Sequence, residues 1–531
     1  MLSDLDPRAL ATNDVPSDEE RNVLRLRQAA ARRDLAALDA EIALALDLDI
    51  TGSTPNMSES FARKKRRGLV KLIRSIDIAI APHKFLPAEL MSCIFTLAFS
   101  AFPTYLPPPG RTSSPLALCH VCIRWRKVAL NTPELWTDVV FRYERNLNPY
   151  KTMDLVEEWF ARCGPSKRLS LEISRWTRQE FPSDHEEVMQ VVFLRLIAAY
   201  ALRFSHLVLR LPEAQIYSFL ATSSLAFPCL RSIHLERDTY MDDTLPSIRK
   251  QDTSFIFSRQ APLVTDMELH NFRHILEVEA TFFTWNNLTR FRCHHTPIKV
   301  SEIHSILQQC RKLEDCQLNV DPHINEDDVK SASKTRIRLP FLRRLAIFFG
   351  FLGRPGLSEQ LVGPFLEPLF IPNVKELHIS SVNHARGFPQ QALISLLTRS
   401  SCDIDVLQIS DIYLSEETVS QLAVTLPSLT MLHVGVDHLL PKAVLQEVAK
   451  GQLLPKLQCL VCRIDDLETA IQMLENRWEA SKSPSSPSIQ LSPPVFFMLD
   501  YVGEVINLFQ AVRVDRLRAC GVRIEMNRVG C

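Results

Sequence analysis

Cysteine pairs at short spacing are the first candidates for chemistry, because thiolates and imidazoles are the ligands that zinc prefers in proteins. Cys119-x-x-Cys122 lies on a predicted helix, and Cys459-x-x-Cys462 lies on a predicted strand. Cys462 takes a core position of that strand. Apolar packing therefore explains both pairs better than a metal does.

A third candidate metal site is Cys293-His294-His295, which follows a predicted strand and has Cys310 not far along the chain. Packing is the simpler explanation here too. The glycines at 350, 353 and 356 lack the spacing of a dinucleotide loop, and no Lys-Ser or Lys-Thr follows them, so a tight loop is favoured over a phosphate cradle. No Gly-x-Ser-x-Gly sequence is present. We expect no metal, no cofactor and no enzymatic activity.

Composition argues against several other classes. Lys+Arg and Asp+Glu both number 61, whereas a nucleic-acid-binding protein needs an excess of cations. The 13 cysteines are scattered through 531 residues, as expected for reduced thiols in the cytoplasm, the nucleus or both. The apolar stretch from Leu90 to Phe99 is about half of what spans a bilayer, and the first residues lack the apolar core of a signal peptide. We expect neither a nucleic-acid partner nor a membrane.

The elements that must position any site begin with a helical, coiled-coil-like segment, residues 20–81, after a disordered stretch, residues 1–19. Apolar residues from Leu24 to Ala45 alternate at steps of three and four, which fits a hairpin within the chain or a dimer. A second helix is predicted from Gly68 to Ile80.

A basic run, Arg63 to Arg67, precedes that second helix. A run of this kind is either a solvated helix start or a nuclear import signal. The solvated helix start is the simpler interpretation.

Residues 82–136 carry the most specific pattern in the chain. Periodicity predicts one helix after Pro87 and another across residues 116–130, which makes a small helical domain with an unusually large apolar surface. The residues that define the pattern are Leu86-Pro87, Ile94-Phe95, Val121-Cys122-x-x-Trp125-Arg126 and Ala129-Leu130-x-x-Pro133-x-Leu135-Trp136.

The order of these residues resembles the F-box, and the wider arrangement is similar to a large family of fungal F-box proteins. Such proteins place a coiled-coil-like segment before the box and an amphipathic helix after it, here Val156 to Gly164. The resemblance covers residues 20–175. Two departures are a proline-rich loop from Ser100 to Pro115 and His83-Lys84-Phe85, where the family usually has arginines.

The resemblance implies a three-helix F-box, residues 82–140, that docks onto the Skp-type adaptor of an SCF ubiquitin ligase and, through it, a cullin. The protein would then be a non-catalytic subunit that recognises a protein substrate. The alternative is a protein-interaction scaffold outside any ligase. The candidates for the adaptor contact are Leu86, Pro87, Leu90, Ile94, Val121 and Trp125. Some of these residues must fill the core of the box itself.

A second pattern, apolar-x-x-apolar-x-apolar, recurs through residues 150–475. Gaps of 24 to 34 residues between copies are close to the leucine-rich-repeat period. Each copy predicts a strand followed by a helix, and Gln390 to Arg399 and Ser415 to Leu426 are two such helices. The first residues of the copies are 204, 230, 264, 288, 313, 342, 374, 404, 429 and 457.

The asparagine of the standard repeat is missing, so we expect an irregular α/β leucine-rich-repeat solenoid. A doubly wound domain is disfavoured because its period is longer. The predicted fold class is therefore α+β multi-domain, with a helical N-terminal segment, an F-box and the solenoid. Residues 481–494 are Ser/Pro-rich and expected to be disordered, with Ser483, Ser486 and Ser492 as candidate phosphorylation sites. Residues 495–531 add a final repeat or a cap.

Residues between the apolar positions of each strand should line the opposite face of the array. The candidate substrate-binding residues there are Arg344, Glu376, His378 and His433. His234, His378 and His433 share one repeat position, which fits either an ordinary solvated position or a shared recognition surface.

Overall fold

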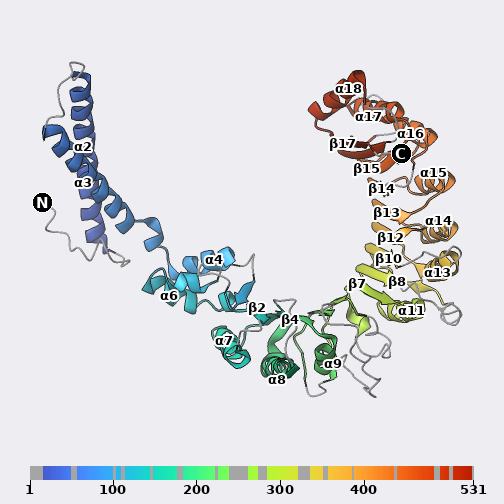
Figure 1. The fold of residues 1–531 in the computed structure, drawn as a ribbon, viewed down its shortest axis with the longest axis horizontal. Helices are drawn as coiled ribbons and strands as arrows, with labels where there is room; N and C mark the ends of the chain where they lie inside the picture. The colour runs from blue at the N-terminus through green and yellow to red at the C-terminus, as the bar shows by residue number, and fades with distance from the viewer. Residues whose placement is uncertain are drawn as a thin grey trace. The chain divides into compact units, whose positions relative to one another are not determined.

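The computed structural model describes residues 16–48, 57–99, 103–108, 114–143, 148–175, 183–221, 225–237, 261–272, 284–320, 335–350, 357–385, 388–435, 439–482, 491–501 and 506–528. The chain divides into two compact units, each of which is described separately (Figure 1). The first unit comprises Met1–Val139 and Leu155–Lys167, and the second comprises Val140–Asp154 and Arg168–Cys531.

The first unit begins with an antiparallel helical hairpin of α2 (Asp18–Leu48) and α3 (Met57–Ala79). Leu24 of α2 is buried together with Ile76 and Ala79 of α3. Near the other end of the hairpin, Arg66 Nε lies 2.7 Å from Asp39 Oδ1. The heptad pattern is therefore used for packing within the chain.

The predicted start of the second helix was wrong. Helix α3 begins at Met57 rather than at Gly68, so the basic run from Arg63 to Arg67 lies inside the helix, where it is exposed. Glycine at residue 68 costs about 1 kcal/mol relative to alanine in a helix interior, but packing against α2 stabilises α3 in spite of this cost.

Short helices follow the hairpin in the first unit. The single helix predicted across residues 116–130 was wrong, because the chain is extended at Cys122 (φ −160°, ψ 169°). The sulfur of Cys122 caps the next helix by accepting a hydrogen bond from the Trp125 amide at 3.4 Å. The elements are η1 (Pro82–Lys84), α4 (Ala88–Phe99), β1 (Thr104–Leu106), α5 (Leu116–Cys119), α6 (Ile123–Leu130) and η2 (Pro133–Trp136).

Strand β2 (Asp138–Tyr143) and helix α7 (Pro149–Ala161) carry residues of both units. Within the first unit, the indole of Trp159 from α7 meets that of Trp136 edge-on, with ring centroids 4.6 Å apart. The amphipathic helix predicted around Val156 is therefore present, and it covers the end of the short-helix module.

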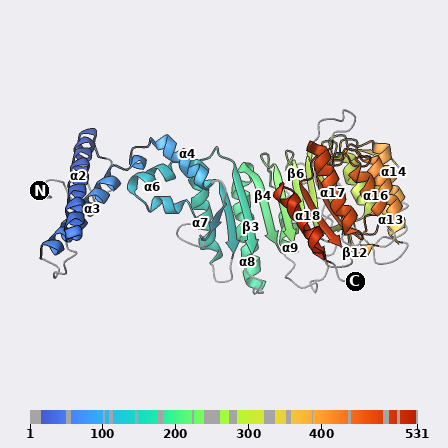
Figure 2. The same cartoon turned by 90° about the horizontal axis from the view of Figure 1, so that it is seen from above.

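A large parallel sheet forms the second unit, so the prediction of mixed helices and strands is confirmed. From β3 onward, its strands follow one another in chain order, and each pairs with its neighbours in parallel register (Figure 2). In sheet order they are β3 (Leu169–Arg175), β4 (Phe204–Leu211), β5 (Ser232–Arg237), β6 (Asp266–His270), β7 (Arg290–Ile298), β8 (Asp315–Val320), β10 (Arg344–Phe349), β12 (Glu376–Ala385), β13 (Val406–Ile412), β14 (Met431–Val434), β15 (Cys459–Ile464), β16 (Phe496–Tyr501) and β17 (Arg523–Arg528).

The recurring apolar triplets account for this sheet. In every copy the three apolar side chains are at most 5 % exposed, as in Leu342, Leu345 and Ile347. In most copies the first residue lies two positions before its strand, where the chain enters the sheet. Strand β3 precedes the first predicted copy. Strands β16 and β17 follow the last copy and lie within residues 495–531, where a final repeat or a cap was expected.

Helices lie together on one side of the sheet, between successive strands in the chain (Figure 1). The two helices predicted from periodicity are present as α14 and α15, and the latter begins at a Ser415 cap. A small parallel pair of β9 (Ile337–Arg338) and β11 (Leu369–Phe370) lies outside the main sheet. The helices are α8 (Ser183–Tyr200), η3 (Ala201–Arg203), α9 (Glu213–Ala221), η4 (Trp285–Asn287), α11 (Val300–Gln309), α13 (Leu357–Leu366), α14 (Gln390–Ser400), α15 (Glu416–Thr425), α16 (Lys442–Ala449), α17 (Leu467–Lys482) and α18 (Leu508–Ala519).

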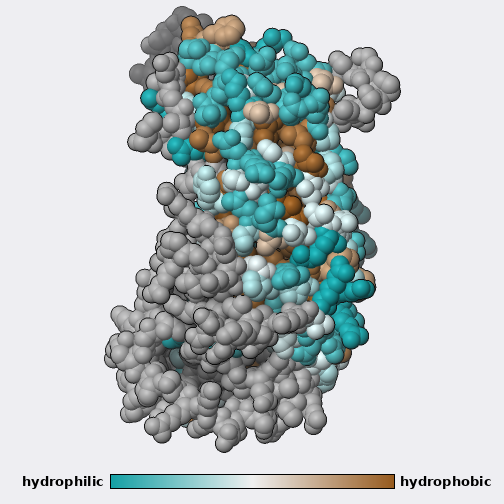
Figure 3. Space-filling view, turned by 90° about the vertical axis from the view of Figure 1, so that its right-hand side faces the viewer, coloured by the Kyte–Doolittle hydropathy of each residue, from teal (hydrophilic) through white to brown (hydrophobic). Residues whose placement is uncertain are grey.

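Hydrophilic residues cover most of the coloured surface on the helix-bearing side, with hydrophobic side chains showing between them (Figure 3). Among the helices of the described residues, none is long and apolar enough to cross a membrane. The glycine loop at 351–356 and most of the Ser/Pro-rich stretch, residues 483–490, lie outside the described residues.

Candidate functional site

Helix α4 carries apolar side chains on two faces. Met91 and Phe95 are buried against the rest of the short-helix module. On the other face Leu90, Ile94 and Leu97 are 52 %, 49 % and 74 % exposed. Their spacing of four and three residues places them in one line along the helix. We call these three residues the α4 stripe.

Contacts between α4, α6 and the preceding segment fix the orientation of the α4 stripe. The Phe95 and Trp125 ring centroids lie 4.9 Å apart. The guanidinium of Arg124 donates hydrogen bonds to the carbonyls of Lys84 and Leu86. These contacts tie the segment before α4 to α6, so the module is held from both sides of its proline-rich loop.

The six residues predicted for the adaptor contact all lie outside the buried core of the module. Pro87, Leu90, Ile94 and Val121 are exposed, and Leu86 and Trp125 are half-buried. The sequence pattern could not separate core from surface in this set. The predicted contact set also omitted Leu97 and Ile123, which are 74 % and 71 % exposed.

In the second unit, the strand residues between the buried positions face away from the core and make rows across the sheet. The first row is a charge ladder in which acids and bases alternate. Arg290 Nη1 lies 2.5 Å from Asp266 Oδ2, and Arg290 Nε lies 3.7 Å from Asp315 Oδ2. Arg344 is in register with Asp315 on one side and with Glu376 on the other. The three interior charges, Arg290, Asp315 and Arg344, are therefore each flanked by opposite charges.

Three of the four predicted substrate-binding residues meet at the end of this charge ladder. Arg344 Nε lies 3.6 Å from Glu376 Oε2, and His378 Nε2 lies 3.8 Å from the same oxygen. The Nδ1 atom of His378 lies 3.0 Å from Gln408 Oε1. His433 follows Gln408 in register on the next strand. Burial lowers the pKa of His433, and so does the neighbouring His378.

A denser cluster lies on β5, β6 and β7, and it was not predicted. Glu268 Oε1 lies 2.9 Å from His270 Nε2 and 3.2 Å from His294 Nε2. Glu268 Oε2 lies 3.9 Å from His234 Nδ1. The His270 ring stacks on both other imidazoles, with centroids 4.8 Å from His234 and 4.3 Å from His294. We call these four residues the His/Glu cluster.

The His/Glu cluster perturbs the titration of its members. Burial lowers the pKa of His234 to about 4, although Glu268 acts in the opposite direction. Burial also lowers the pKa of His294. The pKa of Glu268 is lowered to about 2, chiefly by the hydrogen bond from His270. At neutral pH, His234 is therefore a neutral imidazole beside a carboxylate.

Strand geometry separates the side chains of Cys293-His294-His295, which the sequence analysis weighed as a metal site and explained by packing. These residues lie inside β7 rather than after a strand. Cys293 points into the core, where burial raises its pKa, and Cys310 is also buried with its pKa raised to about 12. His294 points to the opposite face and joins the His/Glu cluster. The usable signal was the spacing of two between Glu268 and His270, which puts both on one face of a strand.

Both Cys-x-x-Cys pairs separate in a similar way. Cys119 is buried in α5, whereas Cys122 caps α6. Cys462 is buried in β15, and Cys459 faces away from that core. The two sulfurs of a pair therefore do not converge on one site. Cys119 and Cys122 belong to different elements, and Cys459 and Cys462 lie on opposite faces of one strand.

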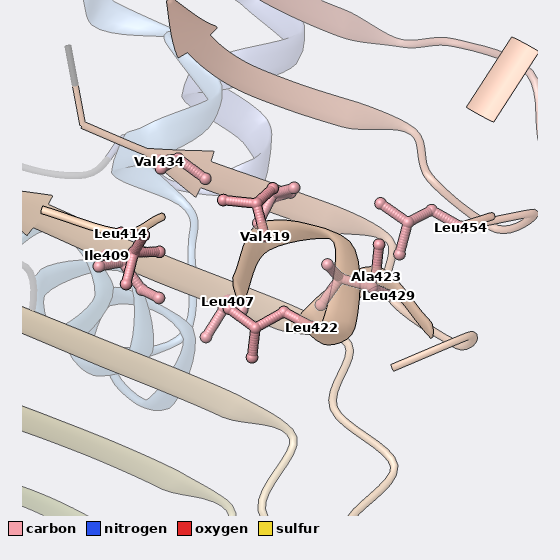
Figure 4. A pocket seen from close by; sticks show the side chains of 10 residues that line it. Leu407, Ile409, Leu414, Val419, Leu422, Ala423, Leu429, Val434 and Leu454 are labelled. Carbon is pink, nitrogen blue, oxygen red and sulfur yellow. The ribbon is translucent and has the colours of Figure 1, made fainter. Parts of the chain in front are cut away.

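A small cavity lies between α15 and the strands β13 and β14 (Figure 4). Its lining side chains are all aliphatic, among them Leu407, Val419 and Leu432. A ligand pocket normally includes a few polar groups that orient the bound molecule. This cavity has none in its lining, so it belongs to the packing of the sheet against its helix.

A scan of the sequence against models of known protein families finds no match, and a search of curated proteins finds no similar sequence.

Proposed function

We propose that this chain is a substrate-recognition subunit of an SCF-type ubiquitin ligase. In this proposal residues 82–140 form an F-box that docks onto a Skp-type adaptor and, through it, a cullin. The parallel array of the second unit is an irregular leucine-rich-repeat solenoid whose strand face binds a protein substrate. The subunit itself is non-catalytic and works in the cytoplasm, the nucleus or both.

The observation that carries the adaptor proposal is the α4 stripe. Leu90, Ile94 and Leu97 leave about half or more of their surface in water, although the same helix has a complete buried face in Met91 and Phe95. Full burial of one such side chain contributes about 1.5–3 kcal/mol. A partner that covers the α4 stripe would therefore gain several kcal/mol. The resemblance to the F-box supports a Skp-type adaptor as that partner.

The order of the strands supports the solenoid part of the proposal. In repeat proteins each unit contacts only its neighbours, and stacked strands make one continuous binding face. Here the strands from β3 to β17 follow chain order in the sheet. The face opposite the helices carries Arg344 and Glu376 of the charge ladder together with His378 and His433, and these four are the residues we propose for substrate contact.

The test compares two pairs of substitutions in the full-length chain, co-expressed with a Skp-type adaptor and a cullin. Leu90→Ser with Ile94→Ser alters the α4 stripe, and we expect recovery of the adaptor in a pull-down to fall at least tenfold. Leu508→Ser with Val512→Ser is the matched control, because these residues on α18 have the same spacing and are 82 % and 59 % exposed. The control should recover as much adaptor as the unaltered protein.

Two outcomes would count against the proposal. If the α4 variant recovers the adaptor as well as the control does, docking does not use the α4 stripe. If the adaptor binds but cullin never accompanies it, the protein is the scaffold outside a ligase that the sequence left open. Circular dichroism of both variants checks that neither pair of substitutions unfolds the chain.

A further inference from the structure

The His/Glu cluster has the composition and spacing of a metal site. His234, Glu268 and His270 each offer a ligand atom, and these three atoms lie within 4.8 Å of one another. His234 and Glu268 are in register on adjacent strands, and His270 lies two residues beyond Glu268 on the same face. Two strands of one sheet therefore hold all three groups.

We propose that His234, Glu268 and His270 bind a zinc ion. This inference is independent of the ubiquitin-ligase proposal, and it departs from the expectation of no metal that the sequence alone supported. Two imidazoles and one carboxylate are a ligand set that zinc takes in proteins, with the fourth tetrahedral position open. Imidazole ligands suit zinc better than magnesium or calcium, which take oxygen ligands.

Distances in the His/Glu cluster fit an ion with small side-chain movements. Zinc–nitrogen bonds of about 2.0–2.1 Å place tetrahedral ligand atoms about 3.3 Å apart. Glu268 Oε1 lies 2.9 Å from His270 Nε2, and Glu268 Oε2 lies 3.9 Å from His234 Nδ1. These two separations, which involve the two oxygens of one carboxylate, lie on either side of the required value, and the three ligand atoms all lie within 4.8 Å of one another. An ion between the groups would replace the present hydrogen bond between Glu268 and His270.

The surroundings supply the outer contacts that orient metal-binding histidines. A ligating imidazole usually donates its second ring N–H to a carboxylate or a carbonyl. The Nε2 atom of His234 is buried without a hydrogen bond among the described residues, and it lies 3.6 Å from Glu236 Oε2. Arg210 Nε holds that carboxylate at 2.9 Å. Binding of zinc through Nδ1 would fix the tautomer in which Nε2 carries the proton toward Glu236.

The three proposed ligand side chains are partly buried, so they are less free to move than side chains in open solvent. The side chains of His234, Glu268 and His270 are only 15 %, 26 % and 22 % exposed. The third imidazole, His294, stacks on His270 and is itself fixed by Gln317 at 2.9 Å. The side chains are therefore largely ordered before an ion arrives, and the small movements that binding requires cost little conformational entropy.

The experiment titrates zinc into the full-length, chelator-treated protein by calorimetry, and it repeats the titration with cobalt to record the visible spectrum. We expect one zinc per chain at this site and a spectrum of tetrahedral cobalt with nitrogen and oxygen ligands. His234→Ala with His270→Ala should weaken zinc binding at least about 100-fold, since loss of an outer contact alone costs 10–100-fold. Glu268→Gln, which keeps the size of the side chain, should weaken zinc binding at least tenfold.

The matched control is His378→Ala with His433→Ala, which removes two imidazoles from the same face of the sheet. It should bind zinc as tightly as the unaltered protein. Thermal unfolding gives a second readout, because zinc should raise the Tm of the unaltered and control proteins but not that of the His234/His270 variant. The proposal is overturned if the unaltered protein binds no zinc, or if the two double variants bind it equally. A thiolate-to-cobalt charge-transfer band that survives in the His234/His270 variant would assign binding to cysteines and overturn it too.

Discussion

The aromatic rings of Phe95 and Trp125 pack with their centroids 4.9 Å apart, and this contact joins α4 to α6 across the proline-rich loop. Phe95 is 3 % exposed, whereas Leu97 on the same helix is 74 % exposed. Two residues of α4 that are only two positions apart thus have different roles. Phe95 holds the module together, and Leu97 faces water.

The first prediction contrasts these two positions. Phe95→Ala should lower the free energy of unfolding by about 3–5 kcal/mol, since it removes a buried aromatic side chain and leaves a cavity. Leu97→Ala should change it by no more than about 0.5 kcal/mol. Urea unfolding followed by tryptophan fluorescence measures both, because Trp125 lies in the contact. Equal effects of the two substitutions would show that Phe95 is not a core residue.

The second prediction concerns pH and the buried His304 of α11. Its Nε2 lies 3.1 Å from the carbonyl of Phe365, and burial lowers its pKa from the ordinary 6.5. Below that pH the unfolded chain binds a proton that the folded chain does not, so stability should fall with decreasing pH. The slope approaches about 1.4 kcal/mol per pH unit for each such group.

Three other histidines in the described part of the chain, His234, His294 and His433, have pKa values lowered in the same direction. The whole protein should therefore lose stability steeply as the pH falls below 6.5. In His304→Leu the free energy of unfolding should fall less steeply with decreasing pH than in the unaltered protein. The difference in slope should be up to about 1.4 kcal/mol per pH unit, which corresponds to one proton, and urea unfolding at a series of pH values measures it. If the substitution leaves the pH dependence of stability unchanged, His304 has the same pKa in the folded and the unfolded chain.

The third prediction concerns the cap of α17. Asp466 accepts hydrogen bonds from the amide of Thr469 at 3.1 Å and from its hydroxyl at 2.8 Å. Lys442 Nζ lies 2.5 Å away, and the hydrogen bond from it lowers the pKa of Asp466 to about 2. Asp466→Ala should cost about 0.5–2 kcal/mol at neutral pH. The neighbouring Asp465→Ala, which is exposed, is the control and should be nearly neutral.

The sign of the pH effect at Asp466 follows from its lowered pKa. The folded chain keeps this carboxylate ionised below 3.8, where the unfolded chain takes up a proton. Its stabilising contribution is present above pH 3.8 and is lost as the pH falls toward about 2. Asp466→Ala should therefore unfold less steeply than the unaltered protein in this acid range. A chain whose acid unfolding does not depend on Asp466 would refute this account.

The fourth prediction rests on the proposed substrate face. Arg344 and His378 both lie beside the carboxylate of Glu376 at the end of the charge ladder. Joint replacement of the three residues by alanine should release substrates, while adaptor binding and the Tm stay nearly unchanged, because surface contacts of this kind contribute little to stability. Affinity purification with the ligase blocked, followed by mass spectrometry, identifies the partners that are lost.

Glu416→Ala with Glu417→Ala is the control for that experiment, since these exposed acids lie on α15 on the helix-bearing side. The control should retain the full set of partners. If the triple variant also retains them, substrates dock elsewhere on the protein.

The positions of the strands were predictable because a strand that is buried on one face needs apolar residues at fixed local spacing. The apolar-x-x-apolar-x-apolar triplet marks a residue entering the sheet and two alternate residues that point into the core, and these positions are buried in copy after copy. Strand β3 was not predicted, although Leu169, Leu171 and Ile173 have the required alternation. Ser166 and Arg168 stand three positions before Leu169 and Leu171, so the first apolar residue of the triplet is absent.

The His/Glu cluster was not predictable, because it depends on which residues of successive strands are paired. Glu268 and His234 are separated along the chain and meet only through the register of β5 with β6. Register is a property of the whole array, and a slip of one residue would send each side chain to the other face. The sequence shows only that Glu268 and His270 are two residues apart, which places them on one face of a strand.

The break in the helix between α5 and α6 was also not predictable from local pattern. No glycine or proline separates Cys119 from Ile123. The chain nevertheless opens there, because Arg126 Nε reaches back to the carbonyl of Cys119 at 2.7 Å and the Cys122 sulfur caps α6. Tertiary contacts override propensity at such a place.

The chain-order pairing of the strands from β3 to β17 also bears on how such a protein can change over generations. Duplication or deletion of a DNA segment that encodes one strand and its helix would add or remove one rung, and the pairings among the remaining rungs could form as before. The area offered to a partner can therefore grow or shrink in single steps. A sheet whose neighbouring strands come from distant parts of the chain has no such freedom, because removal of one strand there breaks contacts between remote segments.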